Sequence, residues 1–561
     1  MEFSNFADYT VAEPGLEEIR KRYHVLFERI DSATDAETCF TAVKDWDLLL
    51  QELTEWSKLT EIRFYQDTDN SDYKAAQDRL DFIWPKYVDL ETQMKRKLLE
   101  SPFRNDLEKV TSPQLFDLWQ CKIRTFDPVI EKDLSNESKL SSEYTALTAK
   151  AQLNFNGKSL TLSEIGKYFE DPDRATRKVA YEVHSAWFGD NAVELDRIYD
   201  EQVTLRHSMA CKLGYDNFVD LGYQRMARVG YGPEEVCAFR EEVKREVVPL
   251  CNQLANRQAQ RLGVDTLMYW DECVHNPDGN PRPQGEHDWM IERAREMFKG
   301  MGHGLDDFFE NMHTQGMMDL KSRRGKGGGG FCEFLHLLGY PFIFANFNGT
   351  RADVDVFTHE MGHAFQVWSS SHLPMSEMVW PTTEACEIHS MGLEFLSWPW
   401  MELFYGEKAA EELRKIHLTS SIMFIPYGVS IDLFQHMVYE NPKASPEDRN
   451  VMWQEIEQTY LPWYHYGELS AQRSGRLWQM KQHIYNSPFY YIDYTLALTG
   501  ALQFWHKSQA NHELALSDYS ELCRRGGTLP FSGLLDSAGL NSPFSQGCLK
   551  SVIADARRYL L

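Results

Sequence analysis

The sequence predicts a mainly α-helical fold with more than one lobe and a small β-sheet. Along most of the chain, apolar residues recur three and four positions apart with charged residues between them. At 561 residues the chain is too long for one simple hydrophobic core, so two or more lobes are expected. Strand-like residues gather mainly in one region, between residues 331 and 347.

The helical pattern is clearest in the first part of the chain. Segments with helical periodicity are residues 15–30, 36–60, 72–99, 144–154, 161–170, 174–189 and 193–213. Capping residues predict helix starts at Asp72, Ser112, Thr161, Asp171 and Ser445. Proline follows three of these residues and suits the first helical position.

Three short segments are expected to form strands, at residues 266–269, 331–332 and 342–347. The last of these is expected to be an edge strand on which an extended peptide pairs through backbone hydrogen bonds. Residues 276–284 are rich in Pro, Gly and Asn and predict an exposed loop.

Residues 359–363 read His-Glu-Met-Gly-His and are the main functional signal in the chain. Positions four apart share one face of a helix, so His359 and His363 reach one metal ion together. Glu360 lies beside them, where it accepts a proton from a metal-bound water. Large apolar residues flank the motif at helical spacing, which favours a buried helix over a surface helix with two solvated histidines.

A catalytic zinc ion usually takes a third protein ligand and leaves one position for water. The extension of the metzincins is absent, because Ala-Phe-Gln-Val-Trp follows His363. A helix is expected over residues 382–396, and Glu384, Glu387 and Glu394 lie near one face of it. On spacing alone, a metal ligand with a supporting acid and a salt-bridged surface stripe are both open.

The metal motif, followed by Glu387-Ile-His-Ser-Met-Gly-Leu-Glu394, resembles the zinc oligopeptidases of the thimet oligopeptidase and oligoendopeptidase F family. The length of the chain and its segment Ser-Pro-Phe-Tyr-Tyr-Ile-Asp-Tyr are most similar to those of the shorter, Pz-peptidase-like members of the family. The resemblance implies that Glu387 is the third zinc ligand and that Glu394 supports the site. It also implies a two-lobed helical metallopeptidase whose deep central channel admits oligopeptides, with the small β-sheet next to the zinc helix.

A block near the C-terminus, from His483 through Ser-Pro-Phe-Tyr-Tyr-Ile-Asp to Tyr494, resembles the family's loop of one His and several Tyr. The resemblance implies that His483, Tyr491 and Tyr494 face the metal and donate hydrogen bonds to the oxyanion that develops during catalysis. The spacing from the His to the tyrosines is one residue shorter than in the thimet branch, so Tyr490 is a rival for the role of Tyr491. The resemblance is strong from about residue 200, which predicts an N-terminal helical lobe of residues 1–200 and a catalytic domain of residues 201–561.

Residues 323–330, Arg-Arg-Gly-Lys-Gly-Gly-Gly-Gly, do not form a phosphate-binding loop, because Gly327 follows Lys326 where Ser or Thr is needed. A mobile loop whose backbone comes close to a ligand or to another strand is expected.

The charge balance argues against nucleic acid as a partner, since 58 basic against 84 acidic residues leave a net charge of −26. No stretch is long and apolar enough to cross a membrane, and the first residues lack the pattern of a signal peptide. The 10 cysteines form no Cys-x-x-Cys pair, so reduced thiols and a cytoplasmic location are expected. The sequence does not indicate the oligomeric state of the protein.

The prediction is a zinc endopeptidase with one Zn²⁺ per chain, which hydrolyses internal bonds of short oligopeptides by Glu360-assisted attack of zinc-bound water. One alternative is a carboxypeptidase-like zinc exopeptidase, which needs a charged anchor such as Arg323, Arg324 or Lys326. The other is a non-catalytic, zinc-containing peptide-binding protein, although the presence of Glu360 argues against it.

Overall fold

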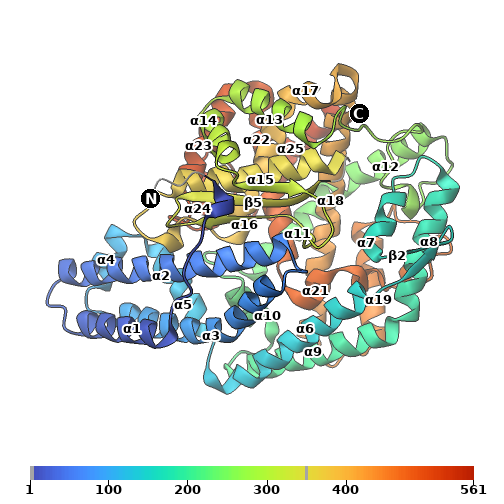
Figure 1. The fold of residues 1–561 in the computed structure, drawn as a ribbon. Coiled ribbons are helices and arrows are strands. Elements are labelled where there is room, and N and C mark those ends of the chain that lie inside the picture. Colours follow the sequence, from blue (N-terminus) through green and yellow to red (C-terminus); the bar gives the residue numbers. More distant parts are fainter. Residues whose placement is uncertain (1–4, 348–350) are drawn as a thin grey trace. The chain divides into compact units, whose positions relative to one another are not determined.

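The computed structural model describes residues 5–347 and 351–561. Helices dominate these ranges, together with one two-stranded and one three-stranded sheet (Figure 1). The larger sheet packs against the helix that bears the His-Glu-Met-Gly-His motif. The mainly α-helical fold with a small sheet next to this helix is therefore confirmed.

The chain divides into two compact units, each built from separate stretches of sequence. Unit 1 contains Met1–Ile123, Arg282–Ala410 and Gly500–Ser542, and unit 2 contains Arg124–Pro281, Glu411–Thr499 and Pro543–Leu561. The division into a lobe of residues 1–200 and a catalytic domain of residues 201–561 stays a prediction.

Unit 1 consists of helices and the three-stranded sheet. Its elements are α1 (Leu16–Asp31), α2 (Ala36–Gln66), α3 (Ser71–Glu100), α4 (Arg104–Val110), α5 (Pro113–Arg124), α13 (His287–Met301), α14 (Leu305–Thr314), β3 (Met318–Lys321), β4 (Phe331–Leu335), β5 (Tyr340–Phe347), α15 (Arg351–Ser370), α16 (Thr383–Leu396), α17 (Glu402–Tyr405), α23 (His512–Arg525) and α24 (Phe531–Ser537). The helices α18 (Glu407–Glu440) and α22 (Tyr491–Ala510) continue from one unit into the other.

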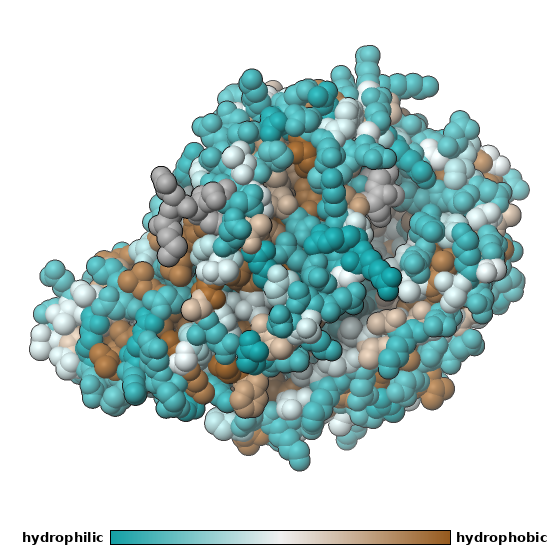
Figure 2. Space-filling model, viewed as in Figure 1, coloured by the Kyte–Doolittle hydropathy of each residue, from teal (hydrophilic) through white to brown (hydrophobic). Residues whose placement is uncertain are grey.

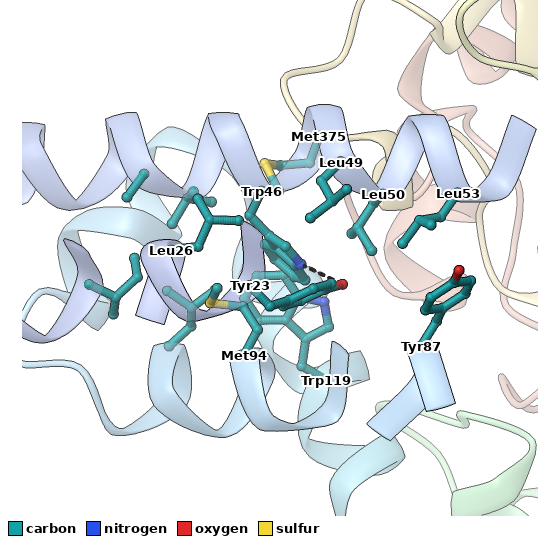
Figure 3. Close-up of a cluster of buried hydrophobic side chains, with 14 of the residues drawn as sticks. Tyr23, Leu26, Trp46, Leu49, Leu50, Leu53, Tyr87, Met94, Trp119 and Met375 are labelled. Atoms are coloured by element: carbon teal, nitrogen blue, oxygen red, sulfur yellow. Dashed lines mark hydrogen bonds between the residues drawn. The ribbon is translucent and has the colours of Figure 1, made fainter. Parts of the chain in front are cut away.

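The N-terminal helices of unit 1 share a hydrophobic core (Figure 3). Trp46 of α2 lies at its centre, where its indole Nε1 donates to the Tyr23 hydroxyl at 3.4 Å. Trp119 packs edge-on against Trp46. Met375 and Met378 belong to the same core, although they lie between α15 and α16 in the sequence. The core therefore holds the connection between the two helices that bear the predicted metal ligands.

Polar contacts fix the same connection. Asp47 Oδ1 accepts hydrogen bonds from the backbone N–H of Ser376 at 2.9 Å and from its hydroxyl at 2.6 Å. Glu377 forms ion pairs with Lys95 at 2.7 Å and Lys122 at 3.0 Å. Burial raises the pKa of Glu377, but the two lysines more than offset this and lower it to about 2. The carboxylate therefore stays charged at neutral pH and ties α3 and α5 to this segment.

The three-stranded sheet has the order β3-β5-β4, with β5 parallel to β3 and antiparallel to β4. The prediction that residues 342–347 form an edge strand is wrong, because β5 is the central strand. Residues 342–345 have no exposed surface, and an apolar run without alternation is typical of a strand covered on both faces. Among the described residues, β4 pairs with β5 alone, so β4 is an edge strand. It begins at Phe331, directly after the glycine-rich segment.

Unit 2 is a second helical body with a short hairpin. Its elements are α6 (Glu131–Ala149), β1 (Leu153–Phe155), β2 (Lys158–Leu160), α7 (Leu162–Ile165), α8 (Arg174–Asp190), α9 (Ala192–Lys212), α10 (Phe218–Arg225), α11 (Pro233–Glu246), α12 (Val248–Leu262), α19 (Pro446–Tyr460), α20 (Ser470–Arg473), α21 (Gln482–Asn486) and α25 (Cys548–Leu560), with most of α18 and the start of α22.

Three predictions of local structure in unit 2 are wrong. Helix α8 begins at Arg174 with Asp173 as its N-cap, so the helix start predicted at Asp171 is two residues too early. The hairpin of β1 and β2 occupies part of a predicted helix, which ends at Ala149 instead of residue 154. Residues 266–269 form no strand, because Asp271 accepts a hydrogen bond from the Met268 N–H and a short 3-10 helix begins at Tyr269. The predicted caps at Thr161 and Ser445 are confirmed, and both form capping boxes.

Hydrophilic side chains cover most of the face shown in Figure 2, and hydrophobic residues form scattered patches. Among the helices of the described ranges, none combines the length and apolar character needed to cross a bilayer.

Candidate metal centre and active site

Helix α15 presents the metal motif from inside unit 1. His359 and His363 lie on one face of this helix, as four-residue spacing requires. Phe357, Met361 and Phe365 are buried on its other sides, where α15 packs against β4, β5, α16 and α23. The predicted burial of the motif helix is therefore confirmed.

Gly362 brings α16 close to α15. A Cβ atom at this position would lie 2.5 Å from the backbone oxygen of His389 and 2.6 Å from the Cα of Ser390. Both distances are shorter than real Cβ contacts, so only glycine permits this packing. The close approach places Glu387 of α16 beside the two histidines of α15.

Three side chains converge to form a group that can hold a metal ion. One ligand atom each from His359, His363 and Glu387 lies within 4.8 Å of the other two. Glu387 Oε2 is 3.2 Å from His359 Nε2 and 3.5 Å from His363 Nε2. Tetrahedral zinc with bonds of about 2.0–2.1 Å separates its ligand atoms by about 3.3 Å, so the distances and the donor set fit this ion. Glu384 is buried on the same helix but does not belong to the group.

Neighbouring groups orient these ligands. Glu394 Oε1 lies 2.7 Å from His359 Nδ1, and this contact turns Nε2 toward Glu387. Ser390 donates its hydroxyl hydrogen to Glu387 Oε2 at 3.0 Å. Sequence reasoning assigned no role to Ser390 or Gly362, although both lie inside the motifs that it used.

Burial and the two histidines act in opposite directions on the carboxylates of the site. Burial raises the pKa of Glu387, but His363 and His359 more than offset this and lower it well below the usual range. Burial also raises the pKa of Glu360, which the two histidines only partly oppose. Glu360 is therefore a carboxylate with greater proton affinity than one in water.

The glycine-rich segment lies beside Glu360. A Cβ atom on Gly330 would lie 3.3 Å from Glu360 Oε1 and 3.5 Å from the backbone oxygen of Phe344 in β5, so the predicted close approach of this backbone to a strand is confirmed. Lys326 ties the segment down, because its fully buried ammonium contacts Asp319 Oδ1 at 2.9 Å and three backbone oxygens. The Asn346 amide donates to the backbone oxygens of Gly327 and Gly329 at 2.9 Å each. The segment is thus fastened to the sheet at several points.

The predicted His and Tyr cluster forms in unit 2. The His483 ring centroid lies 5.7 Å from that of Tyr490, 5.1 Å from Tyr491 and 6.0 Å from Tyr494. Tyr491 is 5% exposed, whereas Tyr490 and Tyr494 are half-buried. The cluster belongs to unit 2 and the ligand group to unit 1, so the prediction that the two face each other stays a prediction.

A buried polar network anchors this cluster. Arg228 forms an ion pair with Asp493 at 2.9 Å and donates to the Phe489 carbonyl. Gln435 Oε1 accepts a hydrogen bond from the Phe489 N–H at 2.8 Å. Phe489 has φ +68°, a left-handed conformation that needs such support in a residue other than glycine. Sequence reasoning missed Arg228 and Gln435, which are distant in sequence and match no motif.

Two models of peptidase family domains match this chain. The model of peptidase family M3 matches residues 167–282 and 302–553, and the model of the peptidase M3 N-terminal domain matches residues 6–126. The chain belongs to peptidase family M3. This M3 chain is therefore a peptidase, and its family and its His-His-Glu group make it a metallopeptidase.

Solved structures similar to this M3 peptidase extend over nearly its whole length. Pz peptidase A, solved with an inhibitor, is 41% identical, with a TM-score of 0.93 over 99% of both chains. A protein of Bacillus anthracis provisionally named oligoendopeptidase F is 42% identical, with a TM-score of 0.89 over 99% of this chain and 98% of its own.

A more distant relative is the oligoendopeptidase F homologue of Mycoplasma pneumoniae, which is 22% identical over 308 residues. The alignment covers 50% of this chain and 47% of the relative, so it spans only about half of that protein's length.

Proposed function

We propose that this M3 peptidase is a zinc-dependent endopeptidase that cleaves internal bonds of short peptides. The triangle of His359, His363 and Glu387, with Glu360 on the same helix, carries the proposal. Two imidazoles and a carboxylate are a donor set typical of catalytic zinc sites, which keep one position open. The names of the similar proteins support cleavage within a peptide rather than at its end.

Zn²⁺ held by these residues would supply a Lewis acid that polarises the peptide carbonyl and makes water a nucleophile near neutral pH. Glu360 would accept a proton from the attacking water and return it to the amine that leaves. Its burial supports this role, because a carboxylate with a raised pKa holds a proton more readily between the two steps.

His483, Tyr491 and Tyr494 are proposed to donate hydrogen bonds to the oxyanion. Burial and the nearby Lys481 lower the pKa of His483 to about 4, so its ring is neutral at pH 7 and has one N–H to donate. Burial raises the pKa of Tyr491, so its hydroxyl keeps its proton. Tyr490 stays a rival of Tyr491, because both rings approach His483.

An extended substrate is proposed to add to the edge of β4. This strand is paired only with β5, so its other edge carries backbone donors and acceptors. Lys58 of α2 forms an ion pair with Glu333 of β4 at 2.9 Å and supports the strand. Backbone pairing would make binding largely independent of the substrate's side chains.

The exopeptidase alternative loses two of its anchors in the structure. Arg323 pairs with Asp319 at 2.7 Å, and Lys326 is fully buried among its acceptors. Cleavage of a peptide blocked at both ends distinguishes the two activities, because an exopeptidase needs a free terminus.

A cytoplasmic location stays a prediction.

Replacement of Glu360 tests the proposal directly. Glu360→Gln keeps the size of the side chain but cannot accept the proton, so we expect hydrolysis of a blocked peptide to be lost. Metal analysis should still find about one zinc per chain, because the ligands are unchanged. Hydrolysis at the wild-type rate by Glu360→Gln would refute the mechanism, and loss of zinc in this variant would show a structural role.

A further inference from the structure

Lys481 has unusual surroundings in unit 2. It lies between a short 3-10 helix, Leu477–Met480, and α21, and its side chain is half-buried. Its ammonium nitrogen lies 4.9 Å from the ring centroid of Tyr491 and 5.3 Å from that of Tyr427. Aromatic faces attract a cation but do not replace the hydrogen bonds that it makes in water.

No carboxylate among the described residues forms an ion pair with Lys481, and none accepts a hydrogen bond from it. Three lysines whose side chains are more than half covered do have such partners. Lys58 pairs with Glu333, Lys95 with Glu377, and Lys326 with Asp319. Lys481 is thus a half-buried ammonium that packs against two aromatic rings and has no anion among the described residues, so its charge is available to an anionic ligand.

A ligand can reach this position because the surrounding rings are not fully buried. Phe424, Tyr427, Tyr490 and Tyr494 are large aromatic residues that are each partly exposed. Phe424 contacts Tyr427, Tyr491 and Tyr494, so the rings form one continuous cluster next to Lys481.

We propose that Lys481 binds a carboxylate of the peptide substrate and thereby determines which peptides are preferred. This inference depends on the proposed function, because it names a substrate feature for that activity. Lys481 is two residues before His483, so the carboxylate would be close to the groups proposed to contact the reacting bond. A free C-terminus bound there would suit the exopeptidase alternative, whereas an internal Asp or Glu would suit the proposed endopeptidase. The carboxylate could come from the free C-terminus of a peptide or from an Asp or Glu side chain, since both present the same group.

The charge state of Lys481 agrees with this role. Burial lowers the pKa of Lys481 to about 8, so most of the population is still positively charged at pH 7. Partial burial strengthens the attraction to an anion, because less water screens the charge than at an exposed surface.

The test measures binding without turnover, in protein that carries Glu360→Gln. Calorimetry compares a peptide that ends in a carboxylate with the same peptide ending in a carboxamide. We expect the carboxylate form to bind about tenfold more tightly. Lys481→Met should bring the two affinities within about twofold of each other, whereas Lys481→Arg should keep most of the preference. A third peptide, with a carboxamide end and an internal Glu, identifies the source of the carboxylate.

Lys178→Met is the matched control. The Lys178 ammonium lies 5.6 Å from the Trp270 ring but forms an ion pair with Glu182 at 3.5 Å, so this variant should keep the full preference. The inference is overturned if the starting protein does not prefer any carboxylate peptide, or if Lys481→Met keeps the preference. Either result leaves the proposed function untouched, because that depends on hydrolysis by the wild type and its loss in Glu360→Gln.

Discussion

Glu394 Oε1 lies 2.7 Å from His359 Nδ1, so the carboxylate selects the imidazole nitrogen that remains available to a metal. The contact fixes both the tautomer and the plane of the ring. Glu387 and Glu394 are on the same helix, α16, yet they contact opposite nitrogens of His359. The site therefore depends on the rotation of α16 about its own axis as well as on its distance from α15.

Replacement of Glu394 should weaken metal binding. We expect Glu394→Ala to lower zinc affinity about 10- to 100-fold, because His359 loses the group that orients it. Competition with a chelator of known affinity measures the change. Glu513→Gln is the control, since Glu513 is an exposed residue of unit 1 that pairs with His303, and it should leave the affinity unchanged. Equal zinc affinities for Glu394→Ala and the wild type would refute the orienting role.

Gly362→Ala should separate the two ligand helices. The new methyl group would meet backbone atoms of His389 and Ser390, which cannot move without α16. We expect a loss of about 1–3 kcal/mol in the free energy of unfolding and a smaller stabilisation by added zinc. Thermal unfolding with and without a chelator measures both effects.

Gly392→Ala is the matched control for Gly362→Ala. Its Cβ would be 3.4 Å from Cε2 of Tyr519, a contact with a side chain rather than with backbone. We expect this variant to keep the wild-type response to zinc. A response reduced equally in both variants would mean that neither result reports on the distance between α15 and α16.

Glu377→Gln should destabilise unit 1, because it leaves the buried Lys95 ammonium without this anion. Lys95 keeps its ion pair with Glu91, so the cost should lie below the about 3–5 kcal/mol that is typical when a buried charge is left without any partner. Trp119 donates its Nε1 hydrogen to Glu377 at 2.8 Å, so tryptophan fluorescence during urea unfolding is a suitable measurement. Asp31→Asn removes the exposed pair with Lys97 and should cost at most about 1 kcal/mol. Similar costs for the two variants would contradict the importance of the Glu377 contacts.

Glu457 should make the protein less stable as the pH rises from about 4.5 to 7. Burial raises the pKa of Glu457 from 4.5 to about 7, although hydrogen bonds from Tyr466 and Trp453 partly oppose the shift. In this window the folded protein binds the proton and the unfolded chain releases it, so the free energy of unfolding falls with rising pH. Glu457→Gln imitates the protonated form and should remove this contribution.

The advantage of Glu457→Gln over the wild type should therefore grow between pH 4.5 and 7 and then level off, at no more than about 3 kcal/mol. Urea unfolding at a series of pH values measures it. Glu455→Gln, at an exposed position of the same helix α19, is the control. Its free energy of unfolding should differ from that of the wild type by the same amount at every pH. A constant difference between Glu457→Gln and the wild type across this range would contradict the raised pKa.

The helices that carry the metal group were predictable because their own residues specify them. The periodicity of residues 36–60 and the two histidines of α15 need no distant partner to be recognised. The central position of β5 depends on pairing with β3 and β4, which local propensity does not encode. The support of Phe489 by Arg228 and Gln435 likewise joins residues far apart in the chain. Sequence reasoning therefore found the groups proposed to do chemistry but not the groups that hold them.

Unit 1 is completed only by residues near the end of the chain. The metal-ligand helices α15 and α16 pack against α23, and the Gly527 N–H donates to the Met378 carbonyl in the connection between them. Proteins are made from the N-terminus onward, so a growing chain that has reached residue 499 already contains His359, His363 and Glu387 but not the helix α23 that packs against α15 and α16. Exposed apolar surface on a partly made chain is prone to aggregation. The order of synthesis thus creates an interval in which the surfaces of α15 and α16 that pack against α23 are exposed, and a chain truncated before residue 500 should be insoluble.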